Sequence, residues 1–428
     1  MNTNDSFAGF RLSRVADVPV LSRRDNSGKT FRATVLWQRP MGLLHAARAL
    51  LPSLLQHGSA AYPDRPALAR QKERLYGAGV GFSFSRHGER SVLRLSADAV
   101  SGAFLPGAPD QFAHVAELMA EVSTRSRVLA GDVPAALFER ERAQALADAR
   151  SVTEDRARQA RLAAVMLACA GEPYGVPEHG GEAAIAAMQP EDPRDALRDV
   201  LDQGVPVALL AGALPDDAEA NLAAFFAALP KRREGALPLP VQPARREVRS
   251  LRESAPMQQA KVVLVLRTPV PRSSGQVCAL QVAMSLWGGG PHSRLFTEVR
   301  EKRSLCYYAS AGGDSDKGLV LVQSGCDAAS VAAVGEQSLA QLAEIAGGRF
   351  SDTELATAIA VCQGPLKSLD DSPAARLSWT ADQWLRGFDE TPDQRIAELG
   401  RVGRGAVAAA ASALWLDVDY ALLPEAKA

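Results

Sequence analysis

Cysteine and histidine are scarce in this chain of 428 residues. The five cysteines, at positions 169, 278, 306, 326 and 362, show no paired metal spacing, and their odd number and wide scatter favour reduced thiols in the cytoplasm. No two of the six histidines are four residues apart, so no helix presents paired imidazoles for zinc. No apolar run reaches the roughly 18 residues of a membrane span. The first residues are polar and lack the apolar core of a signal peptide. We therefore expect a cytoplasmic protein with no membrane partner.

Charge of either sign is not in excess, with 48 basic residues against 49 acidic ones. This balance does not favour nucleic acid or an acidic membrane surface as a partner. Hydrophobic residues make up 47% of the chain and charged residues 23%, which is ordinary globular composition. A chain of this length is too long for one hydrophobic core, so we expect at least two domains.

The sequence contains a long internal repeat. Residues 69–99 and residues 298–329 each read as a helix, an aromatic strand start and a hairpin, with Tyr76 matching Tyr307. A repeat of this period indicates two homologous domains rather than a solenoid. Between the halves, residues 230–250 combine four prolines with mixed charges, which is typical of a linker. The sequence therefore predicts an N-terminal domain at 1–229 and a C-terminal domain at 251–428.

The order of the predicted elements is strand, helix, helix, hairpin and further helices. This order indicates an α+β fold, with helices on one side of a mostly antiparallel sheet. Pro52 is expected to interrupt the first helix, because proline lacks the N–H that a helix interior uses. The main predicted strands are 31–37, the pair around the turn 87–89, 205–214 and 261–267, and the main predicted helices are 42–56, 109–124, 135–168 and 276–287.

The segment 288–308, GGGPHSRLFTEVREKRSLCYY, stands out from the rest of the chain. Three glycines end an apolar helix, a second helix begins at about Ser293 and carries Arg300, and a strand begins at about Tyr307. Because the chain changes from helix to strand between them, the side chains of Arg300 and Tyr307 are able to point toward one cleft. The alternative is structural, with Arg300 in a surface ion pair with a neighbouring glutamate and Tyr307 packed. Tyr308 is a second candidate phenol, since adjacent strand residues face opposite ways.

This segment resembles the second half of the zinc peptidases of the M16 family, which includes pitrilysin, insulysin and mitochondrial processing peptidase. The resemblance implies two halves with the LuxS/MPP-like metallohydrolase fold that face each other across a cleft. It also implies that Arg300 and Tyr307 assist a transition state, and that the glycines and Tyr308 contact substrate. The matching residues are Gly288, Gly289, Gly290, Ser293, Arg294, Leu295, Phe296, Arg300 and Tyr307.

The zinc motif of active M16 members, His-x-x-Glu-His, has no counterpart here. In the family the motif is followed by a short segment that ends in Gly-Thr. Aligning that ending with Gly58-Ser59 places Ala49 and Ser53 at the two histidine positions and Pro52 at the general base. The later carboxylate ligand is placed at Asp148, with Glu141 one or two turns earlier. An aspartate cannot hold zinc alone, so the resemblance implies no metal and no cofactor in this chain. The five motif positions are Ala49, Leu50, Leu51, Pro52 and Ser53.

Some M16 peptidases divide the work between two chains, one with the zinc motif and one that keeps the Arg/Tyr pair. This chain has the second pattern. The leading hypothesis is a catalytically inactive subunit of a heterodimeric metallopeptidase, whose partner carries His-x-x-Glu-His and the zinc and whose substrates are peptides. The alternative is a structural or peptide-binding scaffold of the same fold without a peptidase partner, which predicts a homodimer. A relocated metal site is a third hypothesis, but Leu118 occupies the second ligand position after His114.

Overall fold

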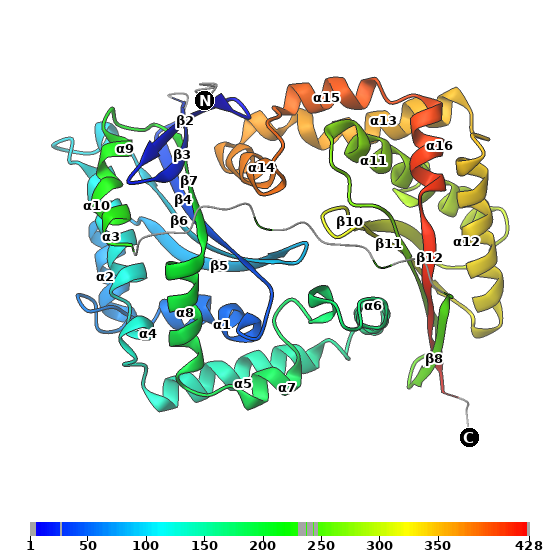
Figure 1. The fold of residues 1–428 in the computed structure, drawn as a ribbon, viewed down its shortest axis with the longest axis horizontal. Coiled ribbons are helices and arrows are strands. Elements are labelled where there is room, and N and C mark those ends of the chain that lie inside the picture. The colour runs from blue at the N-terminus through cyan, green and yellow to red at the C-terminus, as the bar shows by residue number, and fades with distance from the viewer. Residues whose placement is uncertain (1–5, 26–27, 230–236, 238–242, 244–246, 426–428) are drawn as a thin grey trace. The chain divides into compact units, whose positions relative to one another are not determined.

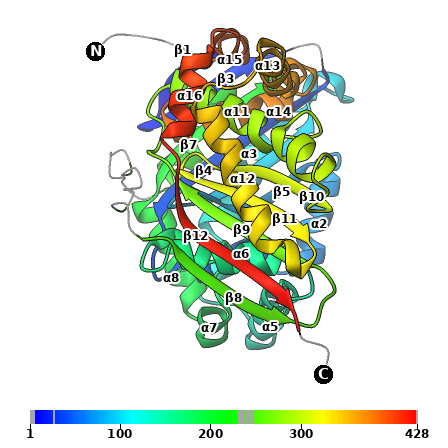
Figure 2. The same cartoon turned by 90° about the vertical axis from the view of Figure 1, so that its right-hand side faces the viewer.

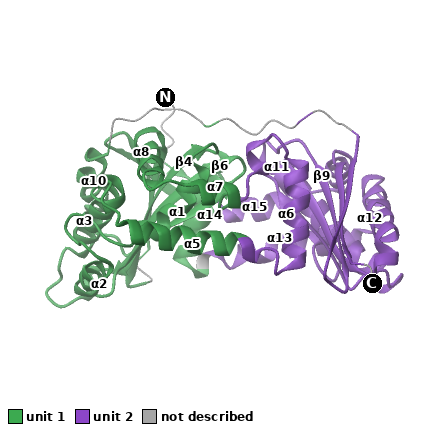
Figure 3. Ribbon diagram, turned by 90° about the horizontal axis from the view of Figure 1, so that it is seen from below, with its two compact units in different colours: residues 1–149, 178–238, 370–390 green, residues 150–177, 239–369, 391–428 purple. Residues whose placement is uncertain are grey.

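The computed structural model describes residues 6–25, 28–229, 237, 243 and 247–425, so most of the expected linker at 230–250 lies outside the described residues. The chain divides into two units (Figure 3). Each unit contains one sheet of mostly antiparallel strands together with helices, which confirms the predicted α+β fold class. Unit 1 comprises Met1–Ala149, Glu178–Pro238 and Asp370–Glu390, and unit 2 comprises Arg150–Pro177, Leu239–Leu369 and Thr391–Ala428.

Unit 1 is built on a seven-stranded sheet with the order β1-β2-β3-β7-β4-β6-β5. Strands β3 and β7 are parallel, and the other neighbouring pairs are antiparallel. The predicted hairpin around 87–89 is confirmed, with His87 of β5 opposite Arg90 of β6. The strands are β1 (Ser6–Phe7), β2 (Phe10–Val15), β3 (Val18–Arg24), β4 (Thr30–Pro40), β5 (Gly79–His87), β6 (Arg90–Val100) and β7 (Val205–Gly212).

One face of this sheet carries the larger core of unit 1. Alternate residues of β4, such as Phe31 and Val35, point into this core, as the period-two geometry of a strand requires. The helices that cover this face include α1 and α8, and Figure 1 shows them beside the sheet. The helices of the unit before residue 230 are α1 (His45–Leu55), α2 (Arg65–Arg74), α3 (Gln111–Thr124), α4 (Arg127–Ala130), α5 (Ala135–Ser151), α7 (Glu182–Ala187), α8 (Asp192–Gln203), α9 (Ala218–Asn221) and α10 (Ala223–Ala227).

The opposite face of the same sheet is covered by a helix from late in the chain. Helix α14 (Pro373–Arg386) packs Leu377, Ala381 and Leu385 against sheet residues such as Leu36 and Val207. The three helix residues are four positions apart, so they form one apolar stripe. The sheet therefore has helices on both faces, and not only on the one side that the sequence predicted.

Unit 2 contains a five-stranded sheet with the order β10-β11-β9-β12-β8. Figure 2 shows β8, β12, β9 and β11 side by side. Only β12 and β8 are parallel among these pairs. The strands are β8 (Arg249–Ala255), β9 (Ala260–Arg267), β10 (Tyr308–Asp314), β11 (Leu319–Cys326) and β12 (Trp415–Pro424), and the helices on one face are α11 (Ser274–Gly288), η3 (Leu295–Glu301), α12 (Val331–Ala346), α13 (Asp352–Lys367), α15 (Pro392–Gly400) and α16 (Arg404–Ser412).

The second face of this sheet is covered by helix α6 (Arg156–Ala168), which comes from the first half of the sequence. Its residues Ala160 and Ala164 pack against Val263 and Val265 of β9. The single helix predicted at 135–168 is therefore wrong. The chain forms two helices with a break at residues 152–155, because α5 and α6 belong to different units.

A buried ion network fastens the end of α6 to the sheet of unit 2. The guanidinium of Arg267, which is fully buried, lies 2.6 Å from Glu172 and 2.6 Å from Asp417. The ammonium of Lys317, also fully buried, lies 2.5 Å from Glu172. Burial opposes ionisation of Glu172, but hydrogen bonds from Arg267 and Lys317 outweigh it and lower the pKa of Glu172. Across the part of the chain that the structure describes, no helix is both long enough and apolar enough to cross a bilayer.

Candidate functional site

Helix α1 carries the positions that the sequence assigns to the lost zinc motif. The helix runs without a break from His45 to Leu55, so the predicted interruption at Pro52 is wrong. Pro52 removes one backbone donor, and tertiary packing of Leu51 and Leu54 in the core keeps the turn helical. Ala49, Pro52 and Ser53 are half-buried. Their spacing of three and four residues places them on one helix face.

The donor set on this face does not fit a zinc ion. Ala49 and Pro52 have no side-chain donor atom, and the hydroxyl of Ser53 donates to the carbonyl of Leu50 at 3.0 Å. Asp148 on α5 is exposed and accepts a hydrogen bond of 2.8 Å from Gln144. Among the described residues, no group of three or more His, Cys, Asp or Glu side chains has a metal-binding arrangement.

His57, which follows α1, contacts Glu141 of α5. Nε2 of His57 is 3.4 Å from Oε1 of Glu141, and Arg140 contacts the same oxygen at 3.0 Å. The His57 side chain is only 13% exposed, although it follows the last turn of α1. Burial lowers the pKa of His57 and outweighs the charge of Glu141, which raises it. The cations Arg140 and Arg65 lower the pKa further. His57 and Glu141 therefore form a local contact that is surrounded by cations.

A polar network behind α1 was not found from the sequence. Nδ1 of His45 lies 2.9 Å from Oγ of Ser91 on β6, and its Nε2 lies 2.8 Å from the carbonyl oxygen of Glu178. Arg48, which is also buried, reaches Asp199 of α8 at 2.6 Å. A histidine and an arginine three residues apart in an otherwise apolar helix are the signal that was available. These contacts fix α1 to its neighbours, and they lie on buried residues rather than at an accessible site.

The segment with the Arg/Tyr pair has a different helix type from the one predicted. Residues Leu295–Glu301 form a π-helix, η3, with the amide of Lys302 donating to the carbonyl of Thr297 at 3.1 Å. Ser304 then adopts a φ of 51°, in the left-handed region that is uncommon for a residue other than glycine. Irregular helix turns of this kind are frequent at functional sites.

Arg300 lies on the solvent side of η3. Its guanidinium stacks over the ring of Phe296 at 4.5 Å, and its Nε lies 3.6 Å from Oε1 of Glu301. The side chain is 38% exposed. The surface pairing that the structural alternative predicted is therefore present with Glu301, but it is long and leaves the guanidinium accessible.

Tyr307 and Tyr308 have distinct environments. Tyr307 is 52% exposed, and its hydroxyl donates to Oδ1 of Asp327 at 2.9 Å. The ring of Tyr308 lies over Gly325 on β11, where a Cβ would come within 2.4 Å of the ring. Lys261 adds a cation–π contact at 5.4 Å to the ring centroid of Tyr308. Tyr308 is thus held by the sheet, and Tyr307 presents its phenol to solvent.

Each of the three glycines has a structural requirement of its own, and at Gly289 a Cβ would lie 2.6 Å from Cα of Ser285. A Cβ at Gly288 would lie 2.3 Å from the amide nitrogen of Ala311, so this glycine lets α11 approach β10. Gly290 has a φ of 143°, which disfavours other residues. Gly288 is buried and Gly289 is exposed. Substrate contact at these positions stays a prediction.

The comparisons with known proteins agree with this geometry. Residues 194–362 match the family model described as the Peptidase M16 inactive domain. Over these residues the chain is similar to the M16 peptidase family. It is 23% identical over 380 residues to a probable inactive metalloprotease of Bacillus subtilis, and the match covers 88% of each chain. The chain is thus similar over most of its length to a relative that is itself named as probably inactive.

Solved structures show the same M16 fold. A conserved protein from Enterococcus faecalis is similar with a TM-score of 0.89 and 26% identity, covering 97% of this chain and 98% of the other. An M16 inactive domain from Pseudomonas fluorescens is similar with a TM-score of 0.80 and 20% identity, over 97% and 98% of the two chains. The recognition of the chain as an M16 homologue of the inactive type is therefore confirmed.

Proposed function

We propose that this chain is the catalytically inactive subunit of a heterodimeric M16 metallopeptidase. A partner chain carries His-x-x-Glu-His and holds the zinc ion that supplies the Lewis acid and the activated water. This chain contributes peptide-binding surface and the side chains of Arg300 and Tyr307. The proposal requires no cofactor in this chain, because Ala49 and Pro52 stand where an active subunit has a ligand and a base.

The observation that carries the proposal is the accessibility of both donors in a chain that has lost the metal ligands. Arg300 is half-buried and Tyr307 is exposed, but both side chains reach solvent, with exposed fractions of 38% and 52%. A guanidinium and a phenol are donors that suit the oxyanion of a tetrahedral intermediate. Tyr307 gives up only a solvent-exposed bond to Asp327 when it donates elsewhere. The π-helix that carries Arg300 and the left-handed Ser304 between the two donors support a site that is shaped for a function.

The peptide-binding surface in this proposal adjoins the same segment. Gly289 is exposed, and its backbone is open to an extended peptide. The ring of Tyr308 is 36% exposed and offers an apolar surface fixed by Gly325 and Lys261. Gly288 is buried, so its contribution to this surface is indirect. It lets α11 pack closely on β10 beneath the surface.

The test is co-expression with each M16 chain of the same genome that carries His-x-x-Glu-His. We expect a complex that cleaves quenched fluorescent peptides, while this chain alone cleaves none. Arg300→Ala and Tyr307→Phe should each lower kcat by about 100-fold or more, the usual loss for one oxyanion donor. Full activity in the double variant would overturn the assigned role of the two residues.

Matched controls are available in the same segment. Arg303→Ala removes a neighbouring cation that pairs with Glu298, and Tyr308→Phe removes the adjacent hydroxyl. We expect Arg303→Ala to leave kcat unchanged, and Tyr308→Phe to change KM more than kcat. A chain that forms a homodimer and yields no proteolysis with any such partner would instead be the scaffold alternative.

A further inference from the structure

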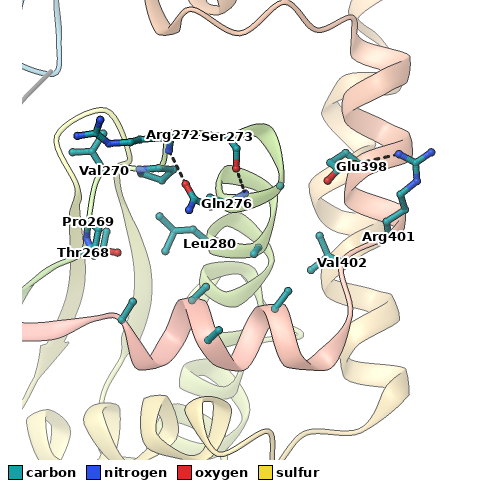
Figure 4. Close-up of a pocket in the computed structure, with 17 residues that line it drawn as sticks. Thr268, Pro269, Val270, Arg272, Ser273, Gln276, Leu280, Glu398, Arg401 and Val402 are labelled. Atoms are coloured by element: carbon teal, nitrogen blue, oxygen red, sulfur yellow. Dashed lines mark hydrogen bonds and ion pairs between the residues drawn. The ribbon is translucent and has the colours of Figure 1, made fainter. Parts of the chain in front are cut away.

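A pocket of about 660 Å³ lies within unit 2, among the β9–α11 loop, the first turns of α11, the end of α15 and helix α16 (Figure 4). Its volume falls in the usual range for small-molecule sites, which is about 300–1,000 Å³. None of its lining residues belongs to the segment of Arg300 and Tyr307. The pocket is therefore a separate feature that the peptidase role does not use.

The floor and one wall of this pocket are apolar. Leu280 and Val402 are buried and line its interior. Helix α16 contributes a stripe of alanines three and four positions apart, of which Ala406 and Ala409 are exposed. Small side chains on this helix keep the wall flat and close to the helix axis. An alkyl chain laid on this wall would remove exposed apolar surface from water.

The opposite wall is formed by the loop that leads into α11. Pro269 and Pro271 line the pocket there, and proline fixes the backbone φ angle at both positions. The loop ends at Ser273, whose hydroxyl caps α11 by accepting from the amide of Gln276 at 3.3 Å. A wall held in this way loses little conformational freedom when a ligand binds, so the pocket is largely preformed.

The rim of the pocket carries an excess of positive charge. Figure 4 shows Arg272 on one side and Arg401 with Glu398 on the other. Arg401 lies 3.2 Å from Glu398, so its charge is already matched. Arg272 has no carboxylate within ion-pair distance among the residues that the structure describes. An anionic group at the rim would thus be matched by Arg272, while a cationic group would not.

We propose that this pocket binds an aliphatic carboxylate, with the alkyl chain on the alanine wall of α16 and the carboxylate at Arg272. The apolar floor favours a ligand with an alkyl chain. The unmatched guanidinium of Arg272 favours a negatively charged head group over a positive one. Binding is independent of the peptidase role, because it uses neither Arg300 nor Tyr307. Its presence or absence therefore leaves the proposed subunit function untouched.

The probe is dodecanoate below its micelle concentration, measured by calorimetry on the full chain. Two matched compounds separate the contribution of the alkyl chain from that of the head-group charge. Acetate has the carboxylate without the long alkyl chain, and dodecyltrimethylammonium has the alkyl chain with the opposite charge. We expect one saturable site for dodecanoate, no binding of acetate, and clearly weaker binding of the cation. Equal affinity for the two dodecyl compounds, or no saturable dodecanoate site, would overturn the proposal.

Variants locate the site. Ala409→Trp fills the pocket and should weaken dodecanoate binding by about tenfold, as expected when about two methylenes lose their burial. Arg272→Gln should weaken it by about two- to fivefold, the range of one exposed ion pair, while Arg401→Gln should change it little. Ala397→Trp, on an exposed part of α15 outside the lining, is the control and should bind normally.

Folding of the pocket variants is checked by thermal unfolding. Ala406→Trp, at a second exposed position of the same wall, decides the question if Ala409→Trp does not fold. Unchanged affinity in a folded wall variant, or a peptide with a blocked carboxyl terminus that binds in place of dodecanoate, would show that the assigned occupant is wrong.

Discussion

The hydroxyl of Tyr307 donates a hydrogen bond of 2.9 Å to the carboxylate of Asp327 across the end of the β10–β11 pair. The amide of Tyr307 also donates to the carbonyl of Gly325 at 2.8 Å, so the backbone and the side chain of this residue are both fixed by the neighbouring segment. The ring of Tyr308 packs on Gly325 of the same strand. Of the two adjacent phenols, Tyr307 is the more exposed, at 52% against 36% for Tyr308.

The pKa of Tyr307 should respond to Asp327. The hydrogen bond to Asp327 and the charge of its carboxylate both favour the neutral phenol and raise the pKa of Tyr307. Asp327→Asn removes the charge, so the pKa of Tyr307 should fall toward the ordinary value of about 10. Ultraviolet difference titration of each protein against its Tyr307→Phe counterpart isolates this one phenol. An identical titration in the two backgrounds would contradict the contact.

The stability of unit 2 should depend on Glu172. Glu172→Gln leaves the buried charges of Arg267 and Lys317 without their shared carboxylate, and we expect a loss of about 3 kcal/mol in the free energy of unfolding. Urea unfolding at neutral pH measures it. The control is Glu336→Gln, which removes a carboxylate of α12 that, among the described residues, contacts neither of these cations.

The same variant makes a prediction about pH. Since the pKa of Glu172 is lowered in the folded state, its contribution is fully present above the unfolded value of about 4.3 and is lost as the pH falls through the lowered folded value. The difference between the wild type and Glu172→Gln should therefore shrink in acid. A difference that persists unchanged below both pKa values would show that the destabilisation has another cause.

Gly288 should tolerate no side chain. Gly288→Ala places a methyl group 2.3 Å from the backbone of Ala311, and the overpacking should cost about 1–3 kcal/mol. Gly335→Ala in α12 is the matched control, because a Cβ there meets no atom within 4 Å. The control should gain up to about 1 kcal/mol from helix propensity. Equal stability of the two variants would argue against the close approach of α11 and β10.

Zinc binding should return when the ligand set is restored. The variant Ala49→His/Pro52→Glu/Ser53→His, combined with Asp148→Glu, places two imidazoles and a carboxylate in the family pattern, and we expect about one zinc ion per chain. Metal analysis after dialysis measures it, with Ala49→His alone as the control that should bind weakly. Stoichiometric zinc in the unaltered chain would refute the assignment of these positions.

The periodicity of apolar residues was sufficient for the strands and helices that build the cores. The alternation at 31–37, the hairpin at 87–89 and the run at 261–267 all correspond to observed strands, β4, β5 with β6, and β9. The first three strands, between Ser6 and Arg24, were not predicted, because their alternation is short and interrupted by the polar residues of tight turns.

Features that depend on tertiary contacts were not visible in the sequence. The π-helix η3 has the ordinary helical pattern, with Leu295 and Val299 buried four residues apart, so its i→i+5 hydrogen bonds could not be predicted from the sequence. The placements of α6 and α14 were missed for a related reason. Their apolar stripes show that each helix packs on something, but only the fold shows on which sheet.

Helices α6 and α14 each pack on the sheet that is formed by the other half of the sequence, and this affects how a cut chain behaves. If the chain is cut at 230–250, the first fragment keeps α6 but lacks Val263 and Val265, against which that helix packs, and the second keeps α14 without Leu36 and Val207. Each fragment alone would leave a sheet face bare to water. Protease nicking between the halves should therefore give two pieces that remain associated until denaturant separates them.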